Sequence, residues 1–442
     1  DGTLVDTAPD LMRAHNHVMN QYGYPTKSTE EIRNLVGQGA GAMLGRSIWG
    51  QAKKEFGKIE DEKIKKEMVK EFVNFYGKNI VNESTLIKGV KDFLIWSKKN
   101  NGPSVVKIID NEIYDITSKE IPTVSSLLEL QNPIDYVKQS HGNKVTSIDE
   151  INSNIDKKNF DPEIRLLAPC DLQVVKACGV TFAKSMVERV IEERASGDLK
   201  KAKELRASIG DLIGSNLKNI VPGSQKAQDV KEVLIKEGLW SQYLEVGIGK
   251  DAEVFTKAQV LSSVGHGAEV GLHPISNWNN PEPEIVLAVN SKSKIIGATL
   301  GNDVNLRDVE GRSALLLGKA KDNNASCSIG PFIRLFDETY NLNDVRQAEI
   351  NMTVEGEDNF KLIGSSLMSE ISRDPEDLVN QTCSRHHQYP DGFMLFLGTL
   401  FAPTEDRDKK GEGFTHKVGD KVIISEKNLG NLINYVNLST EC

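Results

Sequence analysis

The sequence has few cysteines, no long apolar run and no excess of basic residues, and each shortage excludes a class of protein. Five cysteines among 442 residues, without the spacing of a zinc site, argue against a disulfide-stapled secreted fold and for free thiols. No run of about 18 apolar residues is present, so no membrane-spanning helix is expected. The N-terminus lacks the basic and then apolar pattern of a signal peptide. We therefore expect a cytoplasmic protein.

The charge balance is acidic, with 54 Lys and Arg residues against 63 Asp and Glu residues and a formal net charge of −9. Non-specific binding of nucleic acid needs a basic surface, so this class of partner is not expected. The chain is long enough for about two or three domains with a substantial core. These features favour a metabolic enzyme that acts on a small molecule.

Three acids between Asn280 and Pro331 form the strongest candidate site. In PEPEIVLAV the apolar, β-branched run predicts a buried strand, so Glu282 and Glu284, two residues apart, project from the same face. Asp303 lies 303 − 284 = 19 residues after Glu284, beyond a second strand-like run, and an antiparallel return would bring it to the pair.

Carboxylates held side by side repel each other and raise each other's pKa unless a cation lies between them. No imidazole or thiolate is near these acids in the sequence, so an all-oxygen site for Mg²⁺ is predicted, with Mn²⁺ and Ca²⁺ as alternatives and zinc not expected. The spacing alone leaves open a solvated edge, because charged residues are mostly exposed.

The segments PEPEIVLAV, LGNDVNLRD and GKAKDNNASCSIGP together resemble the catalytic core of the fumarylacetoacetate hydrolase superfamily. In that family an E-x-E pair and the Asp of an N-D motif hold the metal, which corresponds here to Glu282, Glu284 and Asp303. The resemblance places the family's substrate-contacting lysine at Lys319, which is predicted to position or deprotonate the substrate. It also places Lys257, in the FTK segment, beside the active site as a substrate-binding residue.

The segment GVTFAKSMVE distinguishes chemistries within this family. Hydrolytic and decarboxylating relatives have G-x-N-Y-x-x-H-x-x-E, whereas this chain has Ser185 in the histidine position and keeps the acid as Glu188. Serine does not act unaided as a base at neutral pH, so activation of water for C–C hydrolysis is not expected. Glu188 is the predicted acid/base, with Ser185 on the same helix face. A solvated helix face is the alternative for both residues.

The apolar run FMLFLG is predicted to be a strand that ends at Gly398 and Thr399. The resemblance implies that this G-T pair binds the substrate carboxylate through a backbone N–H and the hydroxyl, as cradles of unpaired backbone donors do. Arg307, in the segment NLRD, is a further predicted substrate contact.

The first residues, DGTLVDTAPDLMRAHNHVMNQYGYP, resemble a haloacid-dehalogenase phosphatase of the phosphoglycolate phosphatase type, entered within its D-x-D-G-T motif. The family's nucleophilic Asp stands two residues before Asp1, and the phosphate-binding and metal-binding residues do not follow. Because that chemistry needs all of these groups together, residues 1–99 are predicted to be a non-catalytic remnant or an artefactual fusion.

These resemblances imply an α+β fold in three parts. Residues 1–99 form a mostly helical haloacid-dehalogenase cap fragment, residues 103–162 a small N-terminal α+β domain with a linker, and residues 163–442 a mixed β-roll catalytic domain of the fumarylacetoacetate hydrolase type. Because relatives continue a little beyond NYVNLSTEC, the C-terminus is expected to be clipped.

Within the superfamily, VKACGVTFAKSMVERVIEE, LWSQYLEVGIG and SNWNNPEPEIVLAVN resemble the 2-keto-3-deoxypentonate dehydratases of oxidative xylose and arabinose breakdown. The resemblance implies metal-dependent dehydration of a 2-keto-3-deoxy-xylonate or arabinonate to 2,5-dioxopentanoate, by a homodimer or higher homo-oligomer. Two alternatives remain open, a hydrolase of acylpyruvate or fumarylacetoacetate C–C bonds and an inactive chimaeric protein.

Overall fold

The structure is a computed structural model. It describes residues 5–37, 39–49, 62–79, 82–86, 102–155, 164–182, isolated positions between 186 and 201, and residues 220–236, 238, 240–399, 401, 403, 405–409 and 413–442. The chain divides into two compact units, Asp1–Pro103 and Ser104–Cys442. Each unit has its own apolar core and is described by itself.

Helices packed around an apolar core make up the unit Asp1–Pro103. A capping box between Ser28 and Glu31 starts one helix, each side chain bonding the other's backbone N–H. The core includes Val18, Leu44 and Phe72. The elements are β1 (Val5–Asp6), α1 (Ala8–Gln21), α2 (Thr29–Leu35), α3 (Gly39–Trp49), α4 (Glu62–Asn79) and β2 (Thr85–Leu86).

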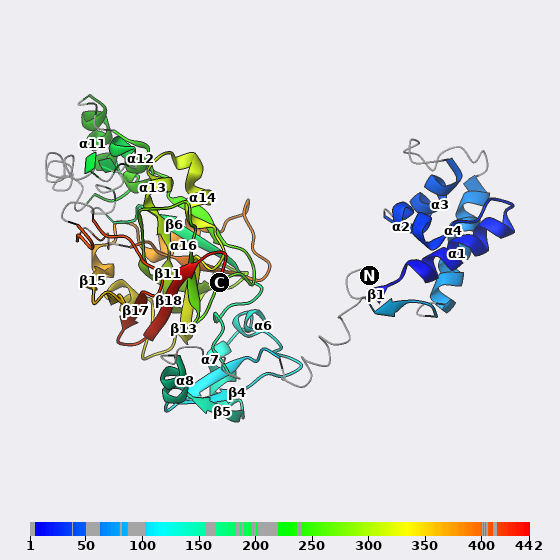
Figure 1. The fold of residues 1–442 in the computed structure, drawn as a ribbon, viewed down its shortest axis with the longest axis horizontal. Helices are drawn as coiled ribbons and strands as arrows, with labels where there is room; N and C mark the ends of the chain where they lie inside the picture. Colours follow the sequence, from blue (N-terminus) through cyan, green and yellow to red (C-terminus); the bar gives the residue numbers. More distant parts are fainter. Residues whose placement is uncertain are drawn as a thin grey trace. The chain divides into compact units, whose positions relative to one another are not determined.

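The unit Ser104–Cys442 begins with a small antiparallel sheet in the order β3-β4-β5. Asp110 and Asn111 join its first hairpin with positive φ angles of 49° and 72°, the conformation that tight two-residue hairpins require. Figure 1 shows this sheet with α7 and α8 at one end of the unit and α11 and α12 at the other. The elements are β3 (Val106–Ile109), β4 (Glu112–Asp115), α6 (Val124–Leu128), α7 (Pro133–Gln139), β5 (Asn143–Ser147) and α8 (Ile148–Ile155).

A six-stranded mixed sheet carries the acids, in the order β13-β11-β10-β16-β6-β7. Among the described strands of this sheet, β16 and β6 are the pair that runs in parallel. All seven residues of β10 are buried, because Ile285 and Leu287 pack into one core and Val286 and Ala288 into another. The strands are β6 (Val174–Gly179), β7 (Glu253–Ala258), β10 (Pro283–Val289), β11 (Ile295–Asp303), β13 (Cys327–Leu335) and β16 (Phe393–Phe396).

A five-stranded sheet in the order β15-β14-β17-β18-β8 covers one face of the first. Met352 and Ile424 from this sheet share a buried cluster with Leu287 of β10, so the main core lies between the two sheets. The strands are β8 (Glu269–Leu272), β14 (Glu349–Glu355), β15 (Lys361–Leu367), β17 (Lys421–Glu426) and β18 (Gly430–Leu438), and a separate pair is β9 (Asn279–Asn280) with β12 (Asn305–Leu306).

Short helices surround these sheets. Strands and helices are mixed, as the sequence predicts, and none of the helices described is both long and apolar enough to cross a membrane. The helices are α11 (Gln225–Lys236), α12 (Gln242–Ile248), α13 (Arg307–Glu310), α14 (Leu317–Lys321), α15 (Leu342–Arg346) and α16 (Pro375–Thr382), with 3₁₀ turns η1 (Ala314–Leu316) and η2 (Met368–Glu370).

Gly301 provides a test of the packing beneath the acids, because it lies directly opposite Glu284 in the β10–β11 register. A Cβ at this position would overlap the ring of Phe396 and lie 2.5 Å from Val286 Cγ2. We expect Gly301→Ala to destabilise the unit by ~1–3 kcal/mol, as overpacking does. Differential scanning calorimetry would show a lower melting temperature.

The matched control is Gly318→Ala in α14, where an added Cβ meets no described atom within 4 Å. Alanine favours a helix over glycine by about 0.5–1 kcal/mol, so this variant should melt at or above the wild-type temperature. A Gly301→Ala variant as stable as the wild type would contradict the close packing.

Candidate metal centre

The three predicted acids converge at one edge of the six-stranded sheet. Glu282 immediately precedes β10, Glu284 is its second residue, and Asp303 is the last residue of β11. The Asp303 N–H donates to the Glu282 carbonyl at 3.0 Å. One carboxylate oxygen of each acid lies within 4.8 Å of the others, and the three residues are only 2–4% exposed.

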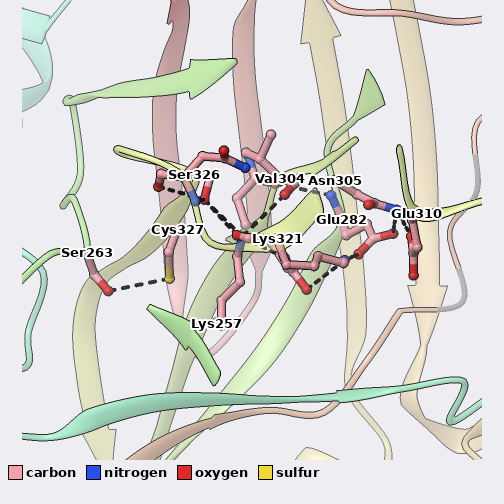
Figure 2. Close-up of polar contacts among 12 residues, drawn as sticks. Lys257, Ser263, Glu282, Val304, Asn305, Glu310, Lys321, Ser326 and Cys327 are labelled. Atoms are coloured by element: carbon pink, nitrogen blue, oxygen red, sulfur yellow. Dashed lines mark hydrogen bonds and ion pairs between the residues drawn. The ribbon is translucent and has the colours of Figure 1, made fainter. Parts of the chain in front are cut away.

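Two buried lysines lie against these acids, and Figure 2 shows both of them together with Glu282. Lys321, the last residue of α14, donates to Glu282 Oε2 and lies 2.9 Å from Asp303 Oδ2. Lys257, from β7, lies 3.0 Å from Asp303 Oδ1. When all five side chains are ionised, three negative charges face two positive charges, which leaves a net negative charge in a buried place.

Asn305 links Glu282 to a fourth buried acid. Its Nδ2 donates to Glu282 Oε1 at 3.0 Å and to Glu310 Oε2 at 2.7 Å. Because both hydrogens of the amide point at carboxylates, the amide orientation is set and Glu282 is held in place. A partner of this kind fixes the geometry of a metal ligand.

Glu284 is held by a backbone group. The Gly398 N–H donates to Glu284 Oε2 at 2.7 Å. Burial raises the pKa of Glu284 well above its usual value, and the negative charges of Asp303 and Glu282 raise it further. Lys321 and the Gly398 N–H oppose this rise only in part. The Glu284 carboxyl therefore sits where additional positive charge would stabilise its ionised form.

This donor set fits a hard divalent cation. Three carboxylates converge without an imidazole or thiolate among them. Burial and the neighbouring negative charges raise the pKa of Glu284, and a cation would neutralise that excess of negative charge. Glu282, Glu284 and Asp303 are the residues that would hold it.

The structure separates the two lysines of the GKAKD segment. Lys319 is exposed and its Nζ lies 3.4 Å from His273 Nε2, whereas Lys321 is 3% exposed and contacts the acids. The lysine at the acids is thus Lys321, which the motif comparison did not select. Residues two apart on a helix point about 200° apart, so only one of them can face the site.

Lys257 lies beside the acids, as expected, but its amine is fully engaged with protein. It donates to the Val304 carbonyl at 3.3 Å, to Ser326 Oγ at 3.2 Å and to the Lys321 carbonyl, and its side chain is 0% exposed. In this geometry Lys257 supports Asp303 and α14.

The other predicted substrate contacts are Gly398, Thr399 and Arg307, and each of them makes contacts within the protein. The Gly398 N–H is committed to Glu284, and the Thr399 hydroxyl accepts the Phe401 N–H at 3.1 Å. The Arg307 guanidinium stacks over Trp278 at 4.4 Å and donates to the Pro403 carbonyl at 3.1 Å, which supports the neighbouring loop.

The predicted acid/base Glu188 and its neighbour Ser185 lie outside the described residues. Sequence reasoning did not select Lys321, Asn305 or Glu310. The sequence feature that could have identified Asn305 and Glu310 is the segment NDVNLRDVE. In it, polar residues recur at the end of a buried strand and on the helix that follows it.

Comparisons with known proteins match two segments of the chain to two different families. Residues 249–437 match the sequence model of the fumarylacetoacetate (FAA) hydrolase C-terminal domain, and residues 1–107 match that of the haloacid dehalogenase-like hydrolases. Both predicted resemblances are therefore confirmed for these segments.

Two curated relatives are dehydratases. A probable 2-keto-3-deoxyxylonate dehydratase of Haloferax volcanii is 31% identical over 194 residues, 44% of this chain and 63% of the relative. The 2-dehydro-3-deoxy-D-arabinonate dehydratase of Saccharolobus solfataricus is 33% identical over 184 residues, 42% of this chain and 58% of the relative. The chain thus spans about six tenths of these two proteins.

The N-terminal residues have relatives of another kind. The phosphoglycolate phosphatase of Haemophilus influenzae is 35% identical over 95 residues, which are 21% of this chain and 42% of that protein.

The fold of the second unit resembles solved dehydratase structures. The apo form of 2-keto-3-deoxy-D-arabinonate dehydratase matches with a TM-score of 0.52 and 24% identity over 75% of this chain and 94% of that one. The same enzyme complexed with magnesium and 2,5-dioxopentanoate matches with a TM-score of 0.50, 24% identity and the same coverage. At this identity the likeness concerns the fold.

The raised pKa of Glu284 predicts that cation binding depends on pH. A cation needs the ionised carboxylate, so its binding must expel the proton that the raised pKa retains. We expect the affinity for Mn²⁺ to rise with pH by up to about tenfold per unit while one proton is released per ion, and to level off above the pKa. Isothermal titration calorimetry in two buffers of different ionisation enthalpy measures the proton release.

Glu284→Gln is the control for this prediction, because it removes the titrating group from the trio. It should bind Mn²⁺ more weakly and with a flatter pH profile. Mn²⁺ affinity of the wild type that does not change with pH would exclude proton release from Glu284.

Proposed function

We propose that this protein dehydrates a 2-keto-3-deoxypentonate to 2,5-dioxopentanoate and uses a divalent cation for this reaction. Mg²⁺ is the expected cation. The observation that carries the proposal is the buried trio Glu282, Glu284 and Asp303 with the Lys321 amine between two of its members. The dehydratase relatives and the dehydratase fold support the choice of substrate class.

The reaction removes a proton from C3 and hydroxide from C4, next to a 2-keto group. Tautomerisation of the resulting C3–C4 enone then converts its C5 alcohol to the aldehyde of 2,5-dioxopentanoate. A cation held by the three acids would supply Lewis-acid stabilisation for the negative charge that develops on the keto oxygen. These steps consume no activated water. They therefore do not need the histidine that handles water in hydrolytic relatives, and this chain has Ser185 in that position.

The residues of the chain supply the proton chemistry and the orientation. Lys321 has its Nζ beside Glu282 and Asp303, and is proposed to donate a proton to a substrate oxygen or, in its neutral form, to accept the C3 proton. This is the role that the motif comparison assigned to Lys319. Asn305 and Lys257 keep Glu282 and Asp303 in place during this exchange.

The remaining roles stay proposals from the sequence. Glu188, with Ser185 beside it, is proposed to protonate the leaving C4 hydroxyl. The Gly398 N–H is bound to Glu284, so Thr399 is proposed to bind the substrate carboxylate. The Thr399 hydroxyl accepts the Phe401 N–H and keeps its own proton to donate.

The proposal is tested with the purified full chain and the D and L forms of 2-keto-3-deoxypentonate. A dehydrogenase that oxidises 2,5-dioxopentanoate reports the product in reactions with Mg²⁺ and with EDTA. We expect product with at least one epimer in Mg²⁺, loss of product in EDTA and recovery when the cation is restored.

Product formation that is unaffected by EDTA would refute the cation-dependent scheme. If folded protein with Mg²⁺ makes no product, an assay of acylpyruvate hydrolysis tests the C–C hydrolase alternative. Inactivity in both assays would favour an inactive chimaera.

The two lysines of α14 form a matched pair for testing the proton chemistry. Lys321→Met removes the amine at the acids and should lower kcat by about 10²–10⁴-fold, the usual contribution of a positioned proton donor or acceptor. Lys319→Met changes an exposed amine of the same helix and should leave kcat near the wild-type value.

Because Lys321→Met also leaves buried carboxylates unpaired, its folding is checked by circular dichroism with and without Mg²⁺. A large loss of kcat in Lys319→Met together with a normal rate in Lys321→Met would return the role to Lys319.

A further inference from the structure

One peptide unit, Leu397–Gly398, lies between Glu284 and a residue to which no role has been given, Thr181. The Gly398 N–H donates to Glu284 Oε2 at 2.7 Å. On the other side of the same peptide, the Leu397 carbonyl accepts the Thr181 hydroxyl at 2.7 Å. Thr181, Leu397 and Glu284 are all buried. A chain of two hydrogen bonds thus runs from Thr181 through a peptide group to a candidate metal ligand.

The strand pairing explains why these groups meet. β6 and β16 are parallel, with Phe396 paired to Ala177, so both strands end at the same edge and Thr181 and Gly398 follow those ends. β10 runs antiparallel to β16, with Val286 paired to Phe396, and the Leu397 N–H extends this ladder to the Ile285 carbonyl. One residue further along this register, after the pair of Ile285 with Leu397, Gly398 lies opposite Glu284.

The peptide unit has little room to move. Gly398 has a φ of +90°, and a Cβ on it would overlap Thr181 Oγ1 and lie 3.1 Å from the Cys178 carbonyl. This combination of a left-handed conformation and close neighbours accepts only glycine. The Thr181 hydroxyl therefore lies where it sets the tilt of the peptide plane.

Thr181 is itself held firmly in place. Its carbonyl accepts both the Ser372 N–H at 2.8 Å and the Ser372 hydroxyl at 2.6 Å. The preceding residue, Val180, has a φ of +57°, a conformation that a β-branched residue rarely adopts. Strained backbone of this kind persists where the surrounding structure over-determines it and is often found at functional sites.

Glu284 depends on this peptide more than the other two acids depend on any single group. Lys321 contacts both Glu282 and Asp303, Asn305 holds Glu282, and Lys257 contacts Asp303. For Glu284, the Gly398 N–H is the one hydrogen-bond donor within the part of the chain that the structure describes.

We propose that Thr181 is a positioning residue for the metal centre, which acts through the Leu397–Gly398 peptide to hold Glu284 in the orientation that binds the cation. The inference rests on the proposed function, because it takes Glu284 as a ligand. The hydroxyl orients the peptide, and by donating to its carbonyl it polarises the N–H toward the carboxylate, as hydrogen bonds in series do.

The test measures Mn²⁺ binding directly on the full chain, by the electron paramagnetic resonance signal of the free ion at constant pH. Loss of a partner that orients a ligand weakens metal binding by about 10–100-fold. We expect an increase in Kd of this size for Thr181→Val, which keeps the shape but loses the hydroxyl. Thr181→Ser keeps the hydroxyl and should bind Mn²⁺ much as the wild type does.

The matched control is Thr382→Val in α16. Thr382 is buried, and its hydroxyl donates to the Leu378 carbonyl at 2.8 Å, so this variant loses the same kind of hydrogen bond. Its melting temperature should fall about as much as that of Thr181→Val, with Mn²⁺ binding unchanged. If Thr181→Val does not fold, Thr181→Ala provides the same comparison without the added methyl group.

A second measurement separates positioning from a general structural role. Weakened binding alone predicts that the activity of Thr181→Val recovers as Mn²⁺ is raised to saturation. Wild-type affinity in a folded Thr181→Val, or weakened binding in Thr382→Val as well, would overturn the role of Thr181 and leave the proposed function intact. A wild-type chain that binds no Mn²⁺ would overturn both.

Discussion

The burial of three like charges at one edge of a sheet is the constraint on which the site depends. An ionised carboxylate withdrawn from water costs several kcal/mol unless opposite charge or hydrogen-bond donors face it. Glu282, Glu284 and Asp303 are almost fully buried together, and the raised pKa of Glu284 shows that the protein groups around them offset this cost only in part. The remaining imbalance is the physical basis for a cation site.

Much of the surrounding structure supplies partners to these acids. Lys257 comes from β7, Lys321 from the end of α14, Asn305 from β12 and the Gly398 N–H from the residues after β16. Because these segments are distant in the sequence, the site exists only when both the sheet pairings and α14 are in place. Gly301 and Gly398 link the packing of the core to the acids. A Cβ added at either position would clash with its neighbours and so disturb the arrangement of the acids.

Local rules predicted the acids well. Alternation along a strand places Glu282 and Glu284 on one face, and a hairpin returns Asp303 beside them. The motif selected Lys319, whereas the lysine at the acids is Lys321, because only the direction of α14 decides which of the two is buried. Asn305 and Glu310 were missed because an amide or acid after a strand is usually solvated, and only the fold shows that these two are enclosed.

The sequence by itself determined the two kinds of segment in the chain, the buried strands of the second unit and the identity of the three acids, because these follow from residue type and short spacings. The tertiary structure alone decided which lysine meets the acids, that the Gly398 N–H serves Glu284, and that Thr181 lies behind it. Those contacts join residues that are 18 to 216 positions apart. Pairing between distant strands, and above all the parallel alignment of β6 with β16, sets such contacts, and no local pattern records them.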